Sequence, residues 1–305
     1  MRPVVLAACI CILSASVSMC ADSAGRIRLS IDQGRIILPA EIGSSGPLKL
    51  ILDTGMGYDG LLIYNPDART SIRLDNPKPY RIGGAGGGSA SSSLCAESMS
   101  FQIGGKSFNH QKIIVLQNDA FRGFPSDGVV GFSILGHSVV EIDYDHAEMR
   151  LHEPGSLTPD TSWEKLPLVF RDNAIPWIRI EVTIGDGPPI PLECYIDSAA
   201  RESVVLLTGA GQKVPVPSEA TPVLLGKGLS GDIYGQSCRI TRLKIGSFVL
   251  EQVTAFSAPA EMRSKQAGAD GVIGAGLLCR FNLIFDYQND CLYIKPNGQF
   301  VSSPA

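Results

Sequence analysis

The chain has 305 residues, of which 44% are hydrophobic and 18% charged, and its formal net charge is −4. This length is sufficient for two modest cores, and the mildly acidic balance without a basic run argues against nucleic acid as a partner. Glycine (33) and proline (20) are plentiful, and the apolar runs are short. Together these features predict an all-β chain with many turns.

Residues 1–21 have the pattern of an export signal. Arg2 supplies a positive start, and an apolar stretch covers residues 4–13. The segment is too short to span a bilayer as an ordinary membrane helix. We therefore expect an exported protein, periplasmic or secreted, with no membrane span. A lipid anchor at Cys20 is the less favoured alternative, because Met19 is bulky for the position before the cysteine.

One pattern then occurs twice. The first copy reads LKLILDTG and places Asp53 after an apolar run, and the second reads LECYIDSA and places Asp197 there. Further landmarks recur at offsets of 142 (184 − 42) or 143 (286 − 143): Ile42-Gly43 with Ile184-Gly185, Ile103-Gly104 with Ile245-Gly246, Val129-Val130-Gly131 with Val272-Ile273-Gly274, and Asp143-Tyr144 with Asp286-Tyr287. So constant an offset indicates an internal repeat. It predicts two pseudo-symmetric lobes that meet at a two-aspartate site.

Each copy has the same predicted order of elements. A strand and a Gly/Pro turn lead to the aspartate strand, and an apolar run, a glycine-rich stretch, alternating strands and a short helical piece follow. The helical pieces are predicted at 132–135 and 275–278. Residues 153–175 are polar and proline-containing, which predicts a surface linker between an N-terminal lobe at 22–152 and a C-terminal lobe at 176–305.

The glycine-rich stretches are predicted to be flaps. They comprise Gly83, Gly84, Gly86, Gly87 and Gly88 in the first copy, and Gly226, Gly228 and Gly231 in the second. A phosphate-binding loop is disfavoured, because no helical pattern follows the first run. A merely flexible surface loop remains the alternative for the run at 83–88.

Five of the eight cysteines follow the signal segment, and an odd number cannot pair completely. Cys95 and Cys238 occupy near-equivalent positions of the two copies. A disulfide and two small buried side chains are both compatible with the sequence.

The sequence Asp53-Thr54-Gly55 is a weak motif by itself. It gains specificity because an apolar strand precedes it and Val129-Val130-Gly131 begins 76 residues later (129 − 53), with 75 in the second copy (272 − 197). Together these motifs resemble the aspartic protease superfamily, and most closely secreted bacterial aspartyl proteases of two lobes with glycine-rich flaps. The resemblance covers nearly all of the chain after the signal segment. It implies an all-β fold of two pseudo-symmetric retropepsin-like β-barrel lobes, with the active site at their junction.

The resemblance also implies roles for particular residues. Asp53 and Asp197 would be the catalytic dyad, Thr54 and Ser198 would clamp the two loops together, and Gly55 and Ala199 would support them. The protein would be a monomeric aspartic-type endopeptidase that binds a peptide or protein substrate as an extended strand under its flaps. No cofactor or metal is expected: the four histidines show no metal-ligand spacing.

Two closely spaced carboxylates cannot both ionise easily, so the pair would share one proton and activate a water molecule. Pepsin-type enzymes commonly carry a hydroxyl residue just after each loop, whereas Met56 and Ala200 stand here. A hydrogen bond to the ionised form lowers a carboxyl pKa, so its absence predicts a less acidic dyad. We expect an optimum in the weakly acid to near-neutral range.

The second loop departs from the family pattern, because it reads Asp-Ser-Ala and places Ala199 where glycine is usual. The favoured interpretation is a slightly shifted loop that still works. The alternative is a catalytically impaired peptide-binding protein on the same fold. A weaker alternative is an envelope protein in which the repeat serves architecture alone.

Overall fold

The computed structural model describes residues 25–171, 174–209, 211–214, 221–259 and 268–301. The predicted export signal at 1–21 and the possible lipid anchor at Cys20 lie outside the described residues. Strands dominate the described chain, so the all-β prediction is confirmed. Short helical turns also occur: α1 (Pro66–Arg69), α2 (Phe132–Leu135), α3 (Ala275–Leu278) and the 3-10 turn η2 (Tyr287–Asn289).

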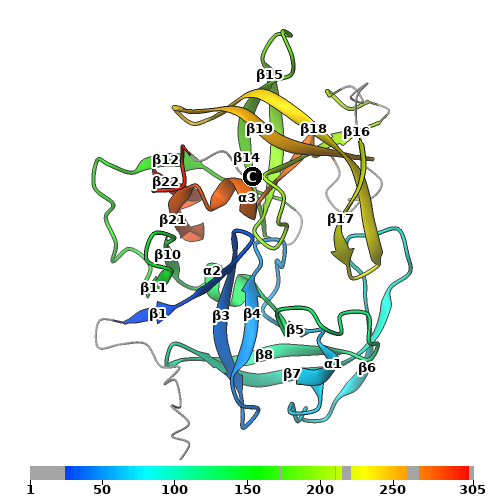
Figure 1. The fold of residues 1–305 in the computed structure, drawn as a ribbon. Helices are drawn as coiled ribbons and strands as arrows, with labels where there is room; N and C mark the ends of the chain where they lie inside the picture. Colours follow the sequence, from blue (N-terminus) through cyan, green and yellow to red (C-terminus); the bar gives the residue numbers. More distant parts are fainter. Residues whose placement is uncertain (1–24, 172–173, 210, 215–220, 260–267, 302–305) are drawn as a thin grey trace, which may run out of the picture.

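The first half of the chain forms a barrel-like sheet, drawn in blue to green at the bottom of Figure 1. Its strands lie in the order β2 (Ser30–Asp32), β3 (Arg35–Ile42), β4 (Leu48–Leu52), β9 (Gly128–Val130), β5 (Gly60–Ile63), β8 (Lys106–Leu116), β7 (Ser91–Ile103) and β6 (Lys78–Ile82). A further pairing between β3 and β7 closes the ring. The strands β2 and β6 remain outside this ring.

The second half repeats this topology strand by strand. Its order is β13 (Val169–Arg171), β14 (Ile175–Thr183), β15 (Ile190–Asp197), β20 (Gly271–Gly274), β16 (Val204–Thr208), β19 (Phe248–Pro259), β18 (Gly231–Ile245) and β17 (Thr221–Gly228). The pairing of β14 with β18 closes this ring as β3 with β7 closes the first. The internal repeat of the sequence is therefore a repeat of structure.

A third sheet joins the two halves. Its order is β1 (Arg26–Arg28), β11 (Glu148–His152), β10 (Val139–Asp143), β21 (Phe281–Asp286), β22 (Cys291–Pro296) and β12 (Glu164–Pro167). The two central strands are repeat equivalents and pair antiparallel. Glu141 lies opposite Ile284, which is its own equivalent (284 − 141 = 143). An approximate twofold axis therefore passes through the middle of this sheet.

The predicted linker at 153–175 is too long. Its second part forms β12 and β13, and Leu166 and Leu168 are buried in the core. The strand β12 borders β22 as β1 borders β11, so the second structural copy begins near Glu164. The polarity and prolines of this segment obscured two strands whose residue types do not match those of the first copy.

The apolar runs before and after each aspartate are continuous because these strands are buried on both faces. In β4, Leu50 and Leu52 point into the large shared core, whereas Ile51 joins a smaller cluster on the opposite face. In β16, Val204 and Leu206 face the shared core and Val205 joins the corresponding cluster of the second half. We call these smaller sets the N-terminal and C-terminal apolar clusters.

The cysteines form no disulfide within the described chain. All five cysteines after residue 21 are free, so of the two alternatives for Cys95 and Cys238 the structure shows unpaired side chains and no disulfide. Cys95 is buried and Cys238 is half-buried. Burial raises the pKa of the Cys238 thiol to about 11, so it remains protonated near neutral pH.

Candidate active site

Both aspartates stand at equivalent strand ends. Asp53 follows β4, which pairs in parallel with β9, and its backbone N–H donates to the carbonyl of Val130 at 2.8 Å. Asp197 is the last residue of β15, which pairs in parallel with β20, where it lies opposite Gly274. Parallel strands end at the same edge of a sheet, so each apolar-apolar-Gly strand lies beside its aspartate loop.

The glycines of these neighbouring strands permit a very close backbone approach. A Cβ atom on Gly131 would lie 2.2 Å from the carbonyl oxygen of Asp53. A Cβ atom on Gly274 would lie 2.1 Å from the carbonyl oxygen of Glu202. Any side chain at either position would displace an aspartate loop, which gives the repeated apolar-apolar-Gly motif its physical reason.

Thr54 and Ser198 interlock the two loops through reciprocal hydrogen bonds. The Thr54 N–H donates to Ser198 Oγ and the Ser198 N–H donates to Thr54 Oγ1, each at 3.0 Å. The hydroxyls in turn donate across the junction, Thr54 to the carbonyl of Ile196 at 2.8 Å and Ser198 to that of Leu52 at 2.6 Å. Both side chains are buried. The two halves therefore fix each other where the aspartates emerge.

The loops also aim both carboxylates at one region. The Gly55 N–H donates to Asp53 Oδ1 at 2.7 Å, and a Cβ on Gly55 would lie 3.0 Å from that oxygen and 3.8 Å from Asp197 Oδ1. Asp197 Oδ1 accepts two backbone N–H groups, from Ala199 at 3.2 Å and Ala200 at 3.1 Å. Burial, then repulsion from Asp197, raises the pKa of Asp53 from 3.8 to about 7.

Ala199 fits the second loop without the special properties of glycine. Its N–H reaches the Asp197 carboxylate, and its backbone φ is not positive. Its methyl group packs against the N-terminal apolar cluster, across the junction. The departure from Asp-Ser-Gly therefore removes no hydrogen bond from the Asp197 carboxylate.

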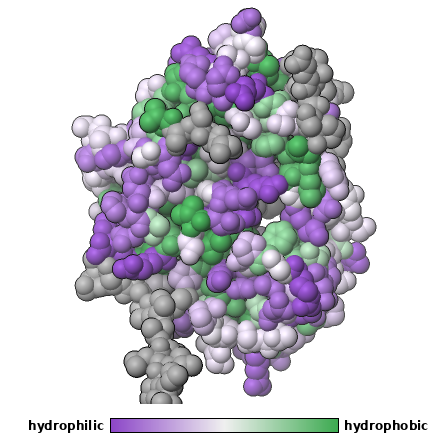
Figure 2. Space-filling model, viewed as in Figure 1, coloured by the Kyte–Doolittle hydropathy of each residue, from purple (hydrophilic) through white to green (hydrophobic). Residues whose placement is uncertain are grey.

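A cavity of about 970 Å³ lies above the two loops and between the barrels. Both aspartates line it, together with apolar side chains from the N-terminal cluster such as Tyr64 and from the C-terminal cluster such as Ile233. The face drawn in Figure 2 is hollowed between its upper and lower parts. Such a volume lies in the range of pockets that bind ligands.

The glycine-rich stretches form the tips of two hairpins over this cavity. The tip with Gly83, Gly84, Gly86, Gly87 and Gly88 joins β6 to β7. In the second hairpin, Gly226 and Gly228 lie at the end of β17 and Gly231 begins β18, so that Leu229 and Ser230 form the turn. The tips hydrogen-bond to each other: the Gly88 N–H donates to the Ser230 carbonyl at 2.6 Å, and the Ser230 N–H donates to the Ala85 carbonyl at 3.0 Å. Residues from both tips line the cavity. We call these hairpins the N-terminal and C-terminal flaps.

Each flap tip also places a side chain against the opposite half. Leu229 of the C-terminal flap packs against the N-terminal apolar cluster, and Ala85 of the N-terminal flap packs against the C-terminal cluster. The flap tips therefore cross. They join the two barrels on one side of the cavity, as the interlocked aspartate loops join them on the other.

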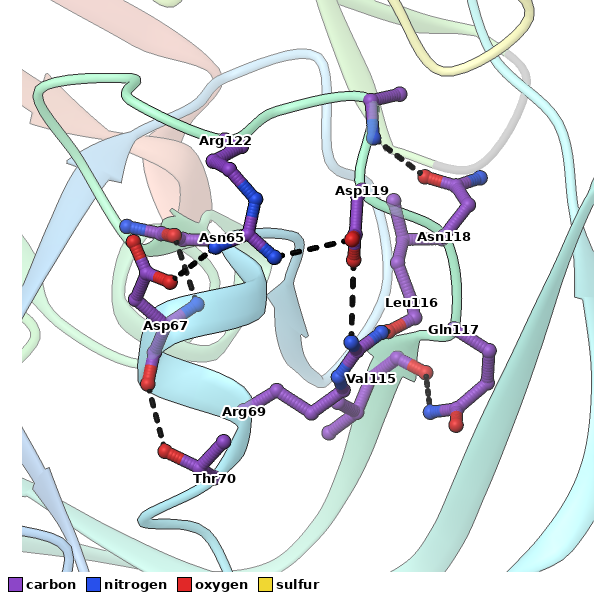
Figure 3. Close-up of polar contacts among 11 residues, drawn as sticks. Asn65, Asp67, Arg69, Thr70, Val115, Leu116, Gln117, Asn118, Asp119 and Arg122 are labelled. Carbon is purple, nitrogen blue, oxygen red and sulfur yellow. Dashed lines mark hydrogen bonds and ion pairs between the residues drawn. The ribbon is translucent and has the colours of Figure 1, made fainter.

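A loop braced by ion pairs forms one wall of the cavity. Phe121 lies on this loop, and its ring packs at a tilt against that of Tyr64, with the ring centroids 4.7 Å apart. Figure 3 shows how the loop is held on α1: Arg122 pairs with Asp67 at 2.7 Å and with Asp119 at 3.0 Å, and Asp119 also pairs with Arg69 at 3.2 Å. Asp67, Asp119 and Arg122 are exposed and Arg69 is half-buried, so these ion pairs orient the loop more than they stabilise the fold.

Of the predicted site residues, the cavity lining includes both aspartates, Gly55, Ala199, Gly83, Gly84, Gly226 and Gly228. Thr54 and Ser198 support the two aspartate loops, whereas Gly86, Gly87, Gly88 and Gly231 lie in the flaps outside the lining. Sequence reasoning missed Phe121, Leu229, Ser230 and Arg201, which also contribute to the site. Phe121 and Arg201 belong to no repeated motif, and Leu229 and Ser230 lie within the second glycine-rich stretch, where only the glycines were named. The aromatic residues of the loop between β8 and β9 were the available signal for Phe121.

Comparison with known proteins adds no assignment. No protein-family model matches the chain, and no curated protein matches it either. Within the described residues, His, Cys, Asp and Glu side chains form no group of three or more that could hold a metal ion. No helix of the described chain is long and apolar enough to cross a membrane.

Proposed function

We propose that the protein is an aspartic endopeptidase with Asp53 and Asp197 as its catalytic dyad. The observation that carries this proposal is the reciprocal clamp of Thr54 and Ser198, which holds two carboxylates toward one cavity. A structural repeat alone needs neither buried hydroxyls that cross the junction nor carboxylates directed into an open cavity. The family resemblance of the motifs agrees with the same assignment.

The surroundings of Asp53 indicate which of the two carboxyl groups holds the shared proton. Burial, and then repulsion from Asp197, raise the pKa of Asp53 to about 7, so Asp53 is the carboxyl group that keeps a proton in the weakly acid range. We therefore assign the shared proton to Asp53. Near neutral pH, the pair carries one proton and one negative charge.

In this mechanism, Asp197 takes a proton from a water molecule held between the carboxylates, and the water oxygen bonds to the peptide carbonyl carbon. Asp53 donates its proton to the carbonyl oxygen as the tetrahedral species forms. Collapse of that species breaks the C–N bond, and the proton gained by Asp197 moves to the leaving nitrogen. The hydroxyl proton returns to Asp53, so the dyad recovers its starting state.

The surroundings support an extended peptide as substrate. The flaps offer backbone groups above the cavity, where a peptide can bond as an added strand. The N-terminal cluster contributes aromatic walls, including Phe121 and Tyr64, which suit large apolar side chains.

The test is peptide cleavage by three single variants. Asp53→Asn and Asp197→Asn should each reduce turnover of a mixed peptide library at least about 1,000-fold, because neither amide can perform its proton transfer. Asp59→Asn is the matched control, since Asp59 is half-exposed and pairs with His137. It should retain activity.

The outcomes separate the alternatives. Near wild-type turnover in either dyad variant contradicts the dyad assignment. Peptide binding without cleavage by the wild-type protein favours the impaired peptide-binding protein. Circular dichroism of each variant checks that the fold is intact.

A further inference from the structure

Arg201 connects the Asp197 loop to the C-terminal flap. Its Nε donates to the carbonyl of Leu225 at 3.0 Å, and its Nη2 donates to the carbonyl of Leu224 at 3.0 Å. Both acceptors belong to β17, the first arm of the flap. One guanidinium therefore holds two consecutive residues of that arm.

An irregularity in β17 makes this contact feasible. Consecutive carbonyls of a regular strand point to opposite sides, so one side chain cannot reach both. The pairing register of β17 with β18 shifts between Leu224 and Gly226, which leaves Leu225 as a bulge. The planar fork of arginine suits two acceptors presented together. The buried Leu225 side chain lines the cavity, so the bond also orients a wall of the site.

The backbone around Arg201 is held firmly on its other side. The carbonyl of Ala200 accepts the Ala275 N–H at 2.7 Å, and the carbonyl of Glu202 accepts the Gly276 N–H at 3.2 Å. The buried Glu202 carboxylate lies 3.4 Å from the Arg201 Nε and balances its charge. One residue before Arg201, the Ala200 N–H donates to Asp197. A short chain of contacts thus joins the flap arm to the carboxylate.

The first half has no such connection. The loop at 53–60 makes no hydrogen bond to the N-terminal flap strands β6 and β7 anywhere in the described chain. Gly57 and Tyr58 stand near the position that Arg201 occupies in the second half. The two flaps are therefore attached to their aspartate loops unequally.

We propose that Arg201 is a positioning residue that couples the C-terminal flap to the geometry of the Asp197 loop. The N-terminal flap is then the one that opens to admit a ligand, while the C-terminal flap stays with its loop. The consequence for catalysis rests on the proposed peptidase function. The coupling itself does not, and hydrogen exchange can test it without any substrate.

The experiment compares Arg201→Lys with Arg242→Lys. Lysine keeps the charge but presents a compact ammonium that cannot bond both carbonyls through a planar fork. Arg242 lies on β18, is half-exposed and pairs with Glu251 at 3.8 Å outside the cavity, so it controls for the loss of an arginine. Amide hydrogen exchange is measured for both flaps and for Ala199 and Ala200.

In the wild-type protein, the tip at 83–88 should exchange faster than residues 223–228. Arg201→Lys should raise exchange of residues 223–228 and of Ala199 and Ala200 by about tenfold or more, since hydrogen bonds to a charged group are lost. Arg242→Lys should leave these rates unchanged. With a cleaved peptide, Arg201→Lys should lower kcat more than it raises KM.

Faster exchange of the flap arm alone would show a purely structural latch and overturn the coupling. Unchanged exchange in Arg201→Lys would also overturn it. If the wild-type protein cleaves no peptide, the exchange data still show whether Arg201 couples the flap to the Asp197 loop. Failure of the coupling is therefore distinguishable from failure of the proposed function.

Discussion

At the scale of single residues, the raised pKa of Asp53 sets the pH range of the proposed activity. Hydrolysis needs the proton on Asp53, and its pKa is raised to about 7. As pH rises through that value, the proton is lost and both carboxylates become ionised. We expect kcat/KM to decline above a pH of about 7, with an optimum in the weakly acid range.

The acidic limb should respond to a hydroxyl beside Asp197. Ala200→Thr adds a donor to a carboxylate that now accepts two backbone N–H groups, so the ionised form gains stability and the limb moves to lower pH. Ala200→Val, which adds bulk without a donor, is the control. A pH–rate profile with a peak near pH 2, or an unmoved limb in the threonine variant, would contradict this account.

The same group should influence stability in a defined direction. The pKa of Asp53 rises from 3.8 to about 7 on folding, so between these values the folded chain binds the additional proton. Its contribution to stability is therefore largest at low pH and is lost as pH rises from about 4 to about 7. Asp53→Asn removes this dependence.

Urea unfolding at several pH values measures that effect. The free energy of unfolding of Asp53→Asn minus that of the wild type should be larger at pH 8 than at pH 4. An unchanged difference between the two proteins across this range would mean that the Asp53 pKa is not raised on folding.

The sequence identified the residues that occur twice. The two aspartates, with Thr54 and Ser198, occupy equivalent places in the repeated motif, so the repeat predicted that they lie close together in the fold. Arg201 has no counterpart in the first copy. Its role depends on the bulge at Leu225, which the local sequence pattern does not predict. Residues that break the symmetry were therefore the ones that sequence reasoning missed.

At the scale of elements, close packing between the flap tips governs access to the cavity. A Cβ atom on Gly228 would lie 2.1 Å from the Ala85 carbonyl oxygen, whereas one on Gly226 meets no atom within 4 Å. Gly228→Ala should therefore separate the tips and raise amide exchange at Gly88 and Ser230 by about tenfold, which corresponds to about 1.4 kcal/mol. Gly226→Ala, two residues away, should leave that exchange unchanged.

Equal exchange in the two alanine variants would show that the tips do not meet in solution. The direction of the effect on peptide cleavage is a separate matter, because an open roof admits substrate faster and also holds it less tightly.

The order of the elements was predictable where residue types repeat, as for the helical turns α2 and α3. It was not predictable at β12 and β13, whose polar residues read as a linker. The strand β12 pairs with β22, far away in the chain, whereas β13 pairs with the next strand, β14. Their few buried side chains, such as Leu166, leave a weak pattern.

At the scale of the whole molecule, the six-stranded sheet makes the two halves depend on each other. A chain ending at residue 163 keeps β10 but loses its partner β21, and it exposes buried residues such as Val140 and Ile142. Unpaired strand edges with apolar faces promote aggregation. We expect residues 22–163 expressed alone to aggregate or to lack a cooperative thermal transition.

Co-expression with residues 164–305 should restore a soluble complex that elutes at the size of the intact protein. A fragment that unfolds cooperatively by itself would show that the first barrel is an independent unit. The cut after residue 163 is chosen because β12 begins at Glu164.

The register of the central strands also has a consequence for ancestry. Because Glu141 faces its own equivalent, Ile284, two identical polypeptides can form the same central pairing without any change of register. A homodimer of one half would then be a sufficient precursor, and joining its subunits end to end would free each copy to diverge. Arg201 and Ala199, both in the second copy, are positions at which the two copies differ. A designed chain of two identical first halves would recreate the precursor.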